Sequence, residues 1–271
     1  MDRVKNSELS STPIPKIIYQ TWKSETLPEK LKPYRDAWMT LHPEPEWRFP
    51  LLLDADLRKL VEDHFPHHLP KYDSFTHTIE RVDFARYIMM YLGGVYADID
   101  TYPVQSIEPF LGYRIVLGTE PVEHATLLYG RAMVLCNAFM MSAPGEKIWI
   151  DFMDYIVENY EYCSNPVHTT GPMAMTKFYE ANKEQFHRDG VLITDPCVFF
   201  PMNATGNISE RCNLTKDTYV VHVWENSWVL SWWQNPIIFN PRYWFWILLF
   251  IFGGLWLYLY FLPSARVQRI R

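Results

Sequence analysis

The sequence has no excess of basic residues, and this absence argues against one large class of partners. Its 25 Lys and Arg residues are outnumbered by 31 Asp and Glu residues, and the formal net charge is -6 at pH 7. Proteins that track a phosphate backbone carry a stripe or patch of Lys and Arg, and no such stripe occurs here. We therefore expect no nucleic-acid partner.

Cysteines are few, and they lack the spacing of a zinc site. Cys136, Cys163, Cys197 and Cys212 form no C-x-x-C pair, which argues against structural zinc but leaves the redox compartment open. Internal repeats are also absent. With 48% hydrophobic and 21% charged residues, the 271-residue chain has the composition of a globular protein rather than a disordered one.

One stretch near the end of the chain lacks charge altogether. Residues 243–265 read YWFWILLFIFGGLWLYLYFLPSA, and a basic tail, 266–271, follows. A helix rises about 1.5 Å per residue and a hydrocarbon core is roughly 30 Å thick, so this stretch is long enough to cross a bilayer. We expect a membrane segment that either spans the bilayer or lies in its interface, where Trp and Tyr are favoured. A buried core helix is the alternative.

The sequence gives conflicting indications of topology. Residues 1–16 contain no apolar run of the kind that a signal peptide has, which favours a cytosolic domain. Three N-x-S/T sequons, at Asn203, Asn207 and Asn213, and the basic tail favour a luminal domain with a cytoplasmic C-terminus. The expected organisation is an N-terminal tail (1–12), one domain (13–235), the membrane segment (243–265) and the basic tail (266–271).

Apolar runs and helical patterns alternate along residues 13–235. Short apolar runs predict strands, and an apolar residue every three or four positions predicts helices. Strands that alternate with helices indicate an α/β fold with a largely parallel sheet, whose ligands bind beyond the carboxyl ends of the strands. The predicted strands are 16–22, 114–120, 133–141 and 219–224, and the predicted helices are 55–65, 78–92, 145–160 and 172–186.

Two aspartates lie one residue apart in the otherwise uncharged run GGVYADIDTYPV, residues 93–104. If this run is a strand, Tyr96, Asp98 and Asp100 point to one face, and the acids lie at its carboxyl end. Two adjacent carboxylates repel each other unless a cation or a proton relieves them. Carboxylate oxygens completed by substrate phosphates are ligands that Mg²⁺ and Mn²⁺ favour, so we expect one of these ions here.

Other interpretations of the acidic pair fit less well. A calcium-binding EF-hand loop from Asp98 would need Gly and Glu where the chain has Pro103 and Pro109. A phosphatase-like D-x-D-x-T pattern is closer, but Tyr102 replaces the Thr. The chain also contains a second D-x-D, at residues 54–56, in which Asp54 is predicted to cap a helix.

The helix predicted before the acidic pair is apolar almost all round. Its charges within residues 81–97 are Arg81, Asp83 and Arg86, and the last two are three positions apart on one face. Gly93 is expected to end the helix in a left-handed conformation, and the next glycine to let the chain reverse. Helix and strand would then bring four charged groups together, although Asp83 and Arg86 also fit a purely structural ion pair.

These motifs together resemble the signature of glycosyltransferase family 32, which includes inositol phosphorylceramide mannosyltransferases and initiating α-1,6-mannosyltransferases. The resemblance spans most of residues 13–235. It rests on IERVDFARYIMMYLGGVYADIDTYPV (79–104), IPKIIYQTWKS (14–24), NAFMMSAPGEKIW (137–149), TTGPMAM (169–175) and VVHVWENSW (220–228).

The resemblance implies a GT-A-like, Rossmann-like domain that transfers a hexose from a nucleotide sugar with retention of configuration. Asp98 and Asp100 would meet the donor's ribose and a Mn²⁺ or Mg²⁺ ion, and His222 would be the third metal ligand, although a lone histidine is more often structural. Asp83 and Arg86 would hold the transferred sugar and the diphosphate. These two residues and the two metal-binding aspartates are the expected catalytic residues.

The resemblance also implies further contacts to the donor. Trp22 would border the nucleotide unless it only packs in the core, and Asn137 would contact sugar hydroxyls. Gly171, in the turn that begins a helix, would bind an anion or only cap that helix. Because such transfer needs water to be excluded, Trp224 and Trp228 are expected to close over the donor. The expected donor-binding set is Trp22, Asp83, Arg86, Tyr96, Asp98, Asn137, Gly171 and Trp228.

A membrane segment close to the domain favours a lipid-linked acceptor. Within the family, this points to transfer of mannose from GDP-mannose to inositol phosphorylceramide, in the Golgi or the endoplasmic reticulum, with a regulatory membrane subunit as a further partner. The alternatives are a glycan-extending hexosyltransferase of the secretory pathway and a non-catalytic membrane-tethered subunit that binds sugar nucleotides.

Overall fold

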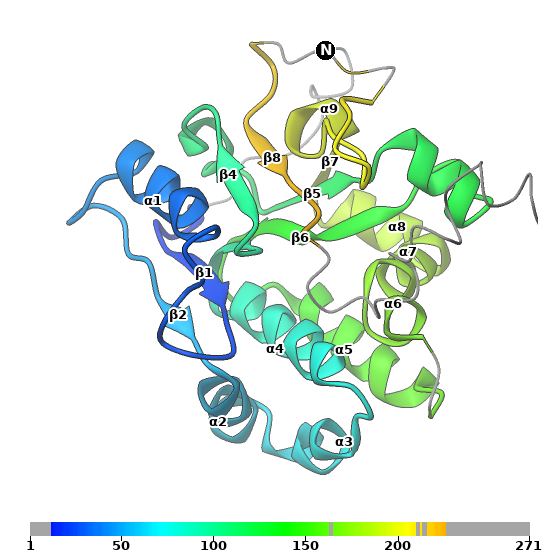
Figure 1. The fold of residues 1–271 in the computed structure, drawn as a ribbon. Coiled ribbons are helices and arrows are strands. Elements are labelled where there is room, and N and C mark those ends of the chain that lie inside the picture. Colours follow the sequence, from blue (N-terminus) through cyan, green and yellow to red (C-terminus); the bar gives the residue numbers. More distant parts are fainter. Residues whose placement is uncertain (1–11, 163–164, 210–211, 213–215, 226–271) are drawn as a thin grey trace, which may run out of the picture. The chain divides into compact units, whose positions relative to one another are not determined.

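The computed structural model describes residues 12–162, 165–209, 212 and 216–225. Its centre is a six-stranded sheet flanked by helices (Figure 1). Strand β6 runs antiparallel to both of its neighbours, whereas the other adjacent pairs are parallel. The predicted α/β class is confirmed, with a mixed rather than a largely parallel sheet. In sheet order the strands are β2 (Leu51–Leu52), β1 (Ile18–Thr21), β3 (Gly94–Ala97), β6 (Leu135–Ser142), β5 (Ile115–Thr119) and β7 (Val191–Thr194).

A second, two-stranded sheet pairs β4 (Thr101–Pro103) with β8 (Val220–His222) in antiparallel register. The helices are α1 (Lys32–Leu41), α2 (Asp54–His64), η2 (Pro66–His68), α3 (Leu69–Ser74), α4 (Thr78–Leu92), η3 (Glu108–Phe110), η4 (His124–Leu128), α5 (Lys147–Asn159), α6 (Pro166–Thr169), α7 (Pro172–Ala181), α8 (Lys183–Arg188) and α9 (Pro196–Phe199).

The two faces of the six-stranded sheet bury two separate apolar cores. Side chains alternate across a strand, so in β3 Tyr96 joins one core while Val95 and Ala97 join the other. The Tyr96 side packs against α2, α4, α5 and α7, and the opposite side packs against Trp38 of α1 and Phe199 of α9. Helix α4 is therefore held between the sheet and the outer helices.

Helix α4 forms as predicted, from Thr78 to Leu92. At its start, the backbone N–H of His77 donates to the Glu80 carboxylate at 2.9 Å, which is one half of a capping box. At its end, Gly93 has φ +88° and ψ 144°, so its φ is positive as expected but its ψ is extended rather than left-handed helical. A Cβ at Gly93 would lie 2.8 Å from the backbone nitrogen of Pro144, so only glycine fits this bend.

Two local predictions need correction. Asp54 is the first residue of α2 and not its cap; the capping contact comes from Asp56, whose carboxylate accepts the backbone N–H of Leu53 at 2.9 Å. The predicted helix 172–186 is two helices, because α7 ends before Asn182 and α8 begins after it. The Asn182 side chain donates to the carbonyl of Phe178 at 2.8 Å and so competes with continuation of the helix.

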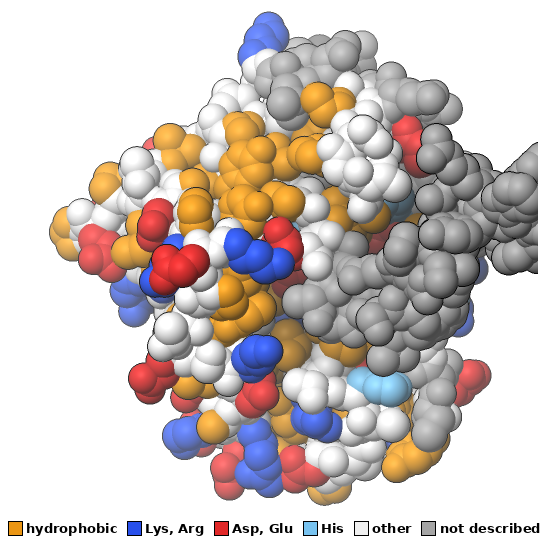
Figure 2. All heavy atoms as spheres, viewed as in Figure 1, with side chains coloured by type: hydrophobic (Ala, Val, Ile, Leu, Met, Phe, Trp, Pro, Cys, Tyr) orange, Lys and Arg blue, Asp and Glu red, His pale blue; other side chains and the backbone are white. Residues whose placement is uncertain are grey.

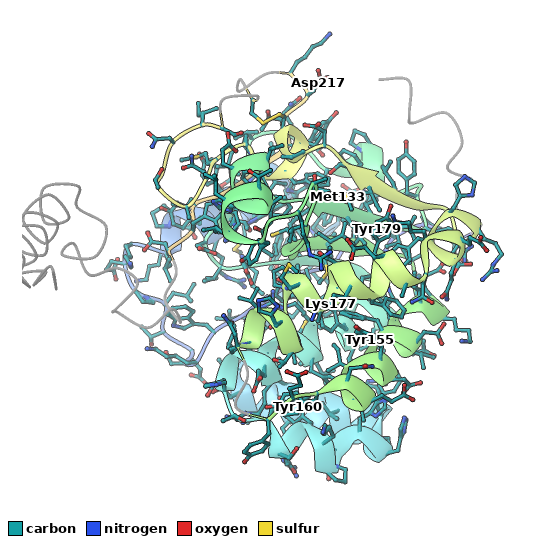
Figure 3. The ribbon with its side chains drawn as sticks, turned by 90° about the vertical axis from the view of Figure 1, so that its right-hand side faces the viewer. Met133, Tyr155, Tyr160, Lys177, Tyr179 and Asp217 are labelled. Carbon is teal, nitrogen blue, oxygen red and sulfur yellow. A yellow bond between two sulfur atoms is a disulfide. The ribbon has the colours of Figure 1, made fainter. Side chains whose placement is uncertain are left out.

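Two further views show the surface of the domain. Figure 2 shows hydrophobic side chains gathered on the face that carries α1 and β4, where Met39 and Val104 are exposed. Figure 3 shows α5 with Tyr155 and α7 with Tyr179 on a neighbouring side of the domain. Cys197 and Cys212 form a disulfide, and Cys136 is free and buried.

The predicted membrane segment, residues 243–265, and Cys163 lie outside the described residues. Within the described part of the chain, every helix is too short or too polar to cross a bilayer.

Candidate functional site

The acidic pair lies in a turn between two strands, and not on one strand as predicted. Strand β3 ends at Ala97, and the backbone N–H of Thr101 donates to the carbonyl of Asp98 at 3.0 Å, which closes a four-residue turn. The Thr101 hydroxyl donates to the same carbonyl at 2.7 Å. The turn, rather than alternation along a strand, therefore brings Asp98 and Asp100 close together.

The second sheet adds His222 to this turn. Its register places Thr101 opposite His222, so the histidine lies next to Asp100, with Nε2 3.3 Å from the Asp100 Oδ1. One ligand atom from each of Asp98, Asp100 and His222 can be chosen so that all three lie within 4.8 Å of one another. The three residues predicted to bind metal are thus brought together by two segments that are far apart in the sequence.

Burial and neighbouring charges shift the pKa values of Asp98, Asp100 and His222. Burial raises the pKa of Asp98, although Arg86 opposes the rise. Burial opposes the charged form of Asp100 as well, but His222 lowers the pKa of that carboxyl below its ordinary value. Burial lowers and Asp100 raises the pKa of His222, and the net shift is upward. The opposite shifts of Asp100 and His222 reflect the close pairing of these two side chains.

Arg86 connects the acidic turn to helix α4. Its Nη2 lies 3.2 Å from Asp83 Oδ1 and 3.5 Å from Asp98 Oδ1, and the side chain is only 3% exposed. Its guanidinium carbon lies 4.5 Å from the centre of the Tyr96 ring, a cation–π contact. Burial by itself lowers the pKa of Arg86, but Tyr96, Asp98 and Asp83 raise it by more. The net shift of the pKa is upward, so the guanidinium stays charged. The predicted proximity of Asp83 and Arg86 is confirmed.

Three neighbouring side chains hold the carboxylate of Asp83. Its carboxylate accepts hydrogen bonds from Asn137 Nδ2 at 3.0 Å and from the Thr170 hydroxyl at 2.9 Å, and it pairs with Arg86. Burial raises the pKa of Asp83 to about 6, although Arg86 opposes the rise. These contacts fix the orientation of the Asp83 carboxylate.

Asn137 lies in β6 where the pairing with β5 is irregular. The register shifts between Leu117 and Gly118, and the Asn137 carbonyl accepts a hydrogen bond from Arg86 Nη1 at 2.8 Å. Its side-chain amide donates to Asp83 and to the Tyr87 hydroxyl, the latter at 2.9 Å. The Asn137 side chain, which was predicted to contact sugar hydroxyls, thus holds Asp83, and the backbone carbonyl of the same residue holds Arg86.

Three other residues predicted to contact the donor lie in different surroundings: Tyr96, Gly171 and Trp22. The fully buried Tyr96 donates from its hydroxyl to Asp98 Oδ1 at 2.7 Å and so orients that carboxylate. The Gly171 backbone N–H already donates to the Pro166 carbonyl at 2.9 Å. Trp22 packs in a small cluster with Ile99, the residue between the two aspartates. Its buried indole N–H has no hydrogen-bond partner among the described residues.

Trp228 lies outside the described residues, but the neighbouring Trp224 is described. The Trp224 ring centre is 4.2 Å from that of His222, and its indole N–H donates to the Met202 carbonyl at 2.7 Å. Trp224 has φ +60°, a conformation rarely adopted by a bulky residue and often found at functional sites.

Sequence reasoning missed two residues that complete the site. Tyr87 donates from its hydroxyl to the Thr170 carbonyl at 2.6 Å and accepts from Asn137, so it joins α4 to the segment before α7. Its spacing of four from Asp83 places both on one helix face, and this was a usable signal. The backbone N–H of Glu225 donates to Asp100 Oδ2 at 2.8 Å. A backbone contact between residues so distant leaves no signal in the sequence.

Comparison with known proteins agrees with this geometry. Residues 28–116, which include α4 and the acidic turn, match the family model described as a glycosyltransferase sugar-binding region containing a DXD motif. This region of the chain therefore belongs to the DXD glycosyltransferase family.

Two relatives of the chain come from Schizosaccharomyces pombe. Inositol phosphoceramide mannosyltransferase 3 is 38% identical over 117 residues, which cover 42% of the chain and 32% of the relative. Inositol phosphoceramide mannosyltransferase 2 is 30% identical over 190 residues, which cover 66% of the chain and 50% of the relative. The chain thus matches between a third and a half of the length of these two relatives.

Among solved structures, the UDP-bound glycosyltransferase domain from the YGT toxin is similar with a TM-score of 0.47 and 8% identity. The likeness covers 68% of the chain and 80% of that domain.

Proposed function

We propose that this protein is a metal-dependent, retaining hexosyltransferase that transfers mannose from GDP-mannose to inositol phosphorylceramide. The observation that carries the proposal is the convergence of Asp98, Asp100 and His222 beside the buried Asp83–Arg86 pair. An isolated D-x-D is common in proteins, but this one lies against a fixed guanidinium and a histidine from a distant strand. The match to the DXD sugar-binding region and the mixed α/β sheet support a GT-A-like domain.

Asp98, Asp100 and His222 fit a divalent cation. Two carboxylates and one imidazole form a donor set that suits Mn²⁺, and Mg²⁺ when phosphate oxygens and waters complete the shell. The Nδ1 atom of His222 is buried without a hydrogen-bond partner among the described residues, so His222 is held mainly through its other nitrogen. When bound, the ion would supply positive charge to the diphosphate of the donor.

Arg86 is suited to the diphosphate as well. A guanidinium that is buried, charged and positioned in advance stabilises negative charge that develops on a leaving group, and it does so without reorganisation. Its Nε has no hydrogen-bond partner among the described residues, so one N–H remains for a ligand. Asp83, with its carboxylate fixed by Asn137 and Thr170, would accept a hydrogen bond from a hydroxyl of the sugar.

The charge distribution favours attack by the acceptor on the face that the diphosphate leaves. The carboxylate nearest the proposed sugar position, that of Asp83, is already paired with Arg86 and two hydrogen-bond donors, which lowers its nucleophilicity. We therefore infer front-face substitution: the acceptor oxygen bonds to the anomeric carbon as the bond from the sugar to the diphosphate breaks, and the acceptor's proton passes to an oxygen of the departing diphosphate. The result is retention of configuration.

The choice of donor and acceptor rests on the relatives and on the chain's own C-terminal region. Both S. pombe relatives are named as inositol phosphoceramide mannosyltransferases. The uncharged residues 243–265 support a membrane segment that would keep the site near a lipid acceptor. The Cys197–Cys212 disulfide supports an oxidising compartment, so we assign the domain to the lumen of the Golgi or endoplasmic reticulum.

A transfer assay tests this function. Purified full-length protein in detergent would receive GDP-mannose, UDP-glucose or UDP-galactose, with inositol phosphorylceramide or a short mannose oligomer as acceptor and with Mn²⁺, Mg²⁺ or excess chelator. We expect transfer from GDP-mannose to the glycolipid, loss of transfer in chelator, and recovery when metal is restored. Full turnover in chelator would contradict metal dependence.

The same assay separates the alternatives. Transfer to the mannose oligomer but not to the glycolipid would indicate a glycan-extending hexosyltransferase. Donor binding without transfer or hydrolysis for any acceptor would indicate a non-catalytic subunit.

A further inference from the structure

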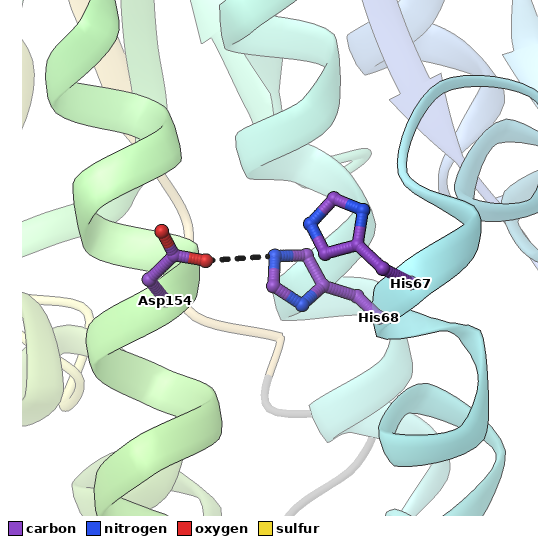
Figure 4. Close-up of side chains that lie close together, drawn as sticks. All are labelled: His67, His68 and Asp154. Atoms are coloured by element: carbon purple, nitrogen blue, oxygen red, sulfur yellow. Dashed lines mark ion pairs between the residues drawn. The ribbon is translucent and has the colours of Figure 1, made fainter.

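We propose that His67, His68 and Asp154 form a second metal site, one that takes Zn²⁺ or a similar late first-row divalent ion. One ligand atom from each of these three residues can be chosen so that all lie within 4.8 Å of one another. The two histidines come from η2 and the aspartate from α5, and Figure 4 shows the two rings and the carboxylate turned toward a common point. None of the three takes part in the sugar-transfer site.

The arrangement of His68 supports the proposal. Its side chain is only 6% exposed, and its Nε2 lies 3.0 Å from the Asp154 Oδ1 (Figure 4). Nevertheless, the geometry does not make this contact a hydrogen bond, and Nε2 has no hydrogen-bond partner among the described residues. A buried imidazole nitrogen that faces a carboxylate oxygen without hydrogen-bond alignment is better satisfied when a third group binds both atoms.

The protein fixes the His68 ring before any ligand arrives. Phe65 lies roughly parallel to it at 6.1 Å between ring centres, and Phe84 of α4 meets it edge-on at 5.6 Å. Little conformational entropy would be lost when this ligand binds.

His67 provides a second nitrogen that can complete the geometry. Its ring centre is 4.0 Å from that of His68, and its side chain is exposed and so free to change rotamer. In a tetrahedral zinc site, with bonds of about 2.0–2.2 Å, ligand atoms lie about 3.3 Å apart, so small side-chain movements would close the cluster. With Asp154 half exposed, water would take the fourth position.

The donor set distinguishes this site from the acidic turn. Two imidazoles and one carboxylate favour Zn²⁺ over Mg²⁺, which prefers an octahedral shell of oxygen atoms. An ion here would join η2 to α5 across α4, two segments far apart in the sequence, and would stabilise the folded state by binding it preferentially.

Zinc binding to the full-length protein tests the proposal. Because Asp98, Asp100 and His222 also bind divalent ions if the proposed function is right, the measurements use an Asp100→Asn background as well as the unaltered protein. Metal-free protein would be titrated with Zn²⁺ against a chromophoric chelator, and thermal unfolding would be followed with and without Zn²⁺. The variants are His67→Gln and Asp154→Asn, with His64→Gln, an exposed histidine at the end of α2, as the matched control.

In the Asp100→Asn background we expect one Zn²⁺ to remain bound and to raise the unfolding temperature by a few degrees. His67→Gln and Asp154→Asn should each weaken binding by at least about tenfold and remove most of the temperature shift. His64→Gln should change neither, and millimolar Mg²⁺ should not compete.

Equal zinc affinity in all three variants, or loss in only one of His67→Gln and Asp154→Asn, would overturn a shared site. These results do not depend on sugar transfer. Failure of the second metal site and failure of the proposed function are therefore distinguishable.

Discussion

The two D-x-D pairs of this chain allow a sharp test of the site, because the structure gives them different tasks. Asp100 accepts the backbone N–H of Glu225 and pairs with His222, whereas Asp56 accepts the backbone N–H at the start of α2. Asp100→Ala removes a buried carboxylate from the turn, and Asp56→Ala removes a capping carboxylate from the start of α2. The effects on activity and stability should then separate.

For Asp100→Ala we expect transfer activity to fall by about 10²- to 10³-fold, the loss typical when one preorganised electrostatic group is removed. The stability cost should be about 1–3 kcal/mol, because the Glu225 N–H loses its acceptor and His222 its counter-charge. For Asp56→Ala we expect a cost of about 1 kcal/mol, typical of a lost helix cap, and activity within about twofold of the unaltered protein.

The assay is transfer of labelled mannose from GDP-mannose at saturating Mn²⁺, with urea unfolding of the same preparations. Folded Asp100→Ala with more than a tenth of the original activity would refute the assignment of the metal site. Equal loss of activity in both variants would show that stability, and not the site, controls the rate.

Further changes test other parts of the structure. Arg86→Lys should lower transfer by about a hundredfold in a folded protein, because an ammonium cannot reproduce the guanidinium's simultaneous contacts; initial rates against donor concentration measure it, and an unchanged rate would contradict the role of Arg86. Burial lowers the pKa of His42 below 6.5, and its Nε2 accepts the Ile107 N–H, so protonation favours the unfolded chain. Stability should therefore fall as the pH drops below about 6.5, less steeply in His42→Gln, in unfolding temperatures measured from pH 7.5 to 5. Replacing Cys197 and Cys212 with serine should cost about 3 kcal/mol by urea unfolding, as expected for a closed loop of this length, while a cost near zero would show that the bond adds no stability.

Features that depend on neighbouring residues could be predicted from the sequence. The apolar pattern of residues 78–92 and the glycines after it defined α4 and its sharp end, since helix periodicity and positive φ are local properties. The spacing of Asp83 and Arg86 placed them on one helix face, and the ordered motifs identified the family. One local prediction was wrong, because the carboxylate that caps α2 belongs to Asp56 and not to Asp54.

Only the tertiary structure decided how the charged groups meet. The turn after β3 replaces the predicted strand face, and the pairing of Thr101 with His222 brings the histidine to Asp100. Contacts of this kind join segments separated by more than a hundred residues, and no local periodicity records which strand pairs with which. His68 and Asp154 likewise meet only because η2 and α5 pack on either side of α4. Residue types thus made the chemistry predictable, and packing fixed the geometry.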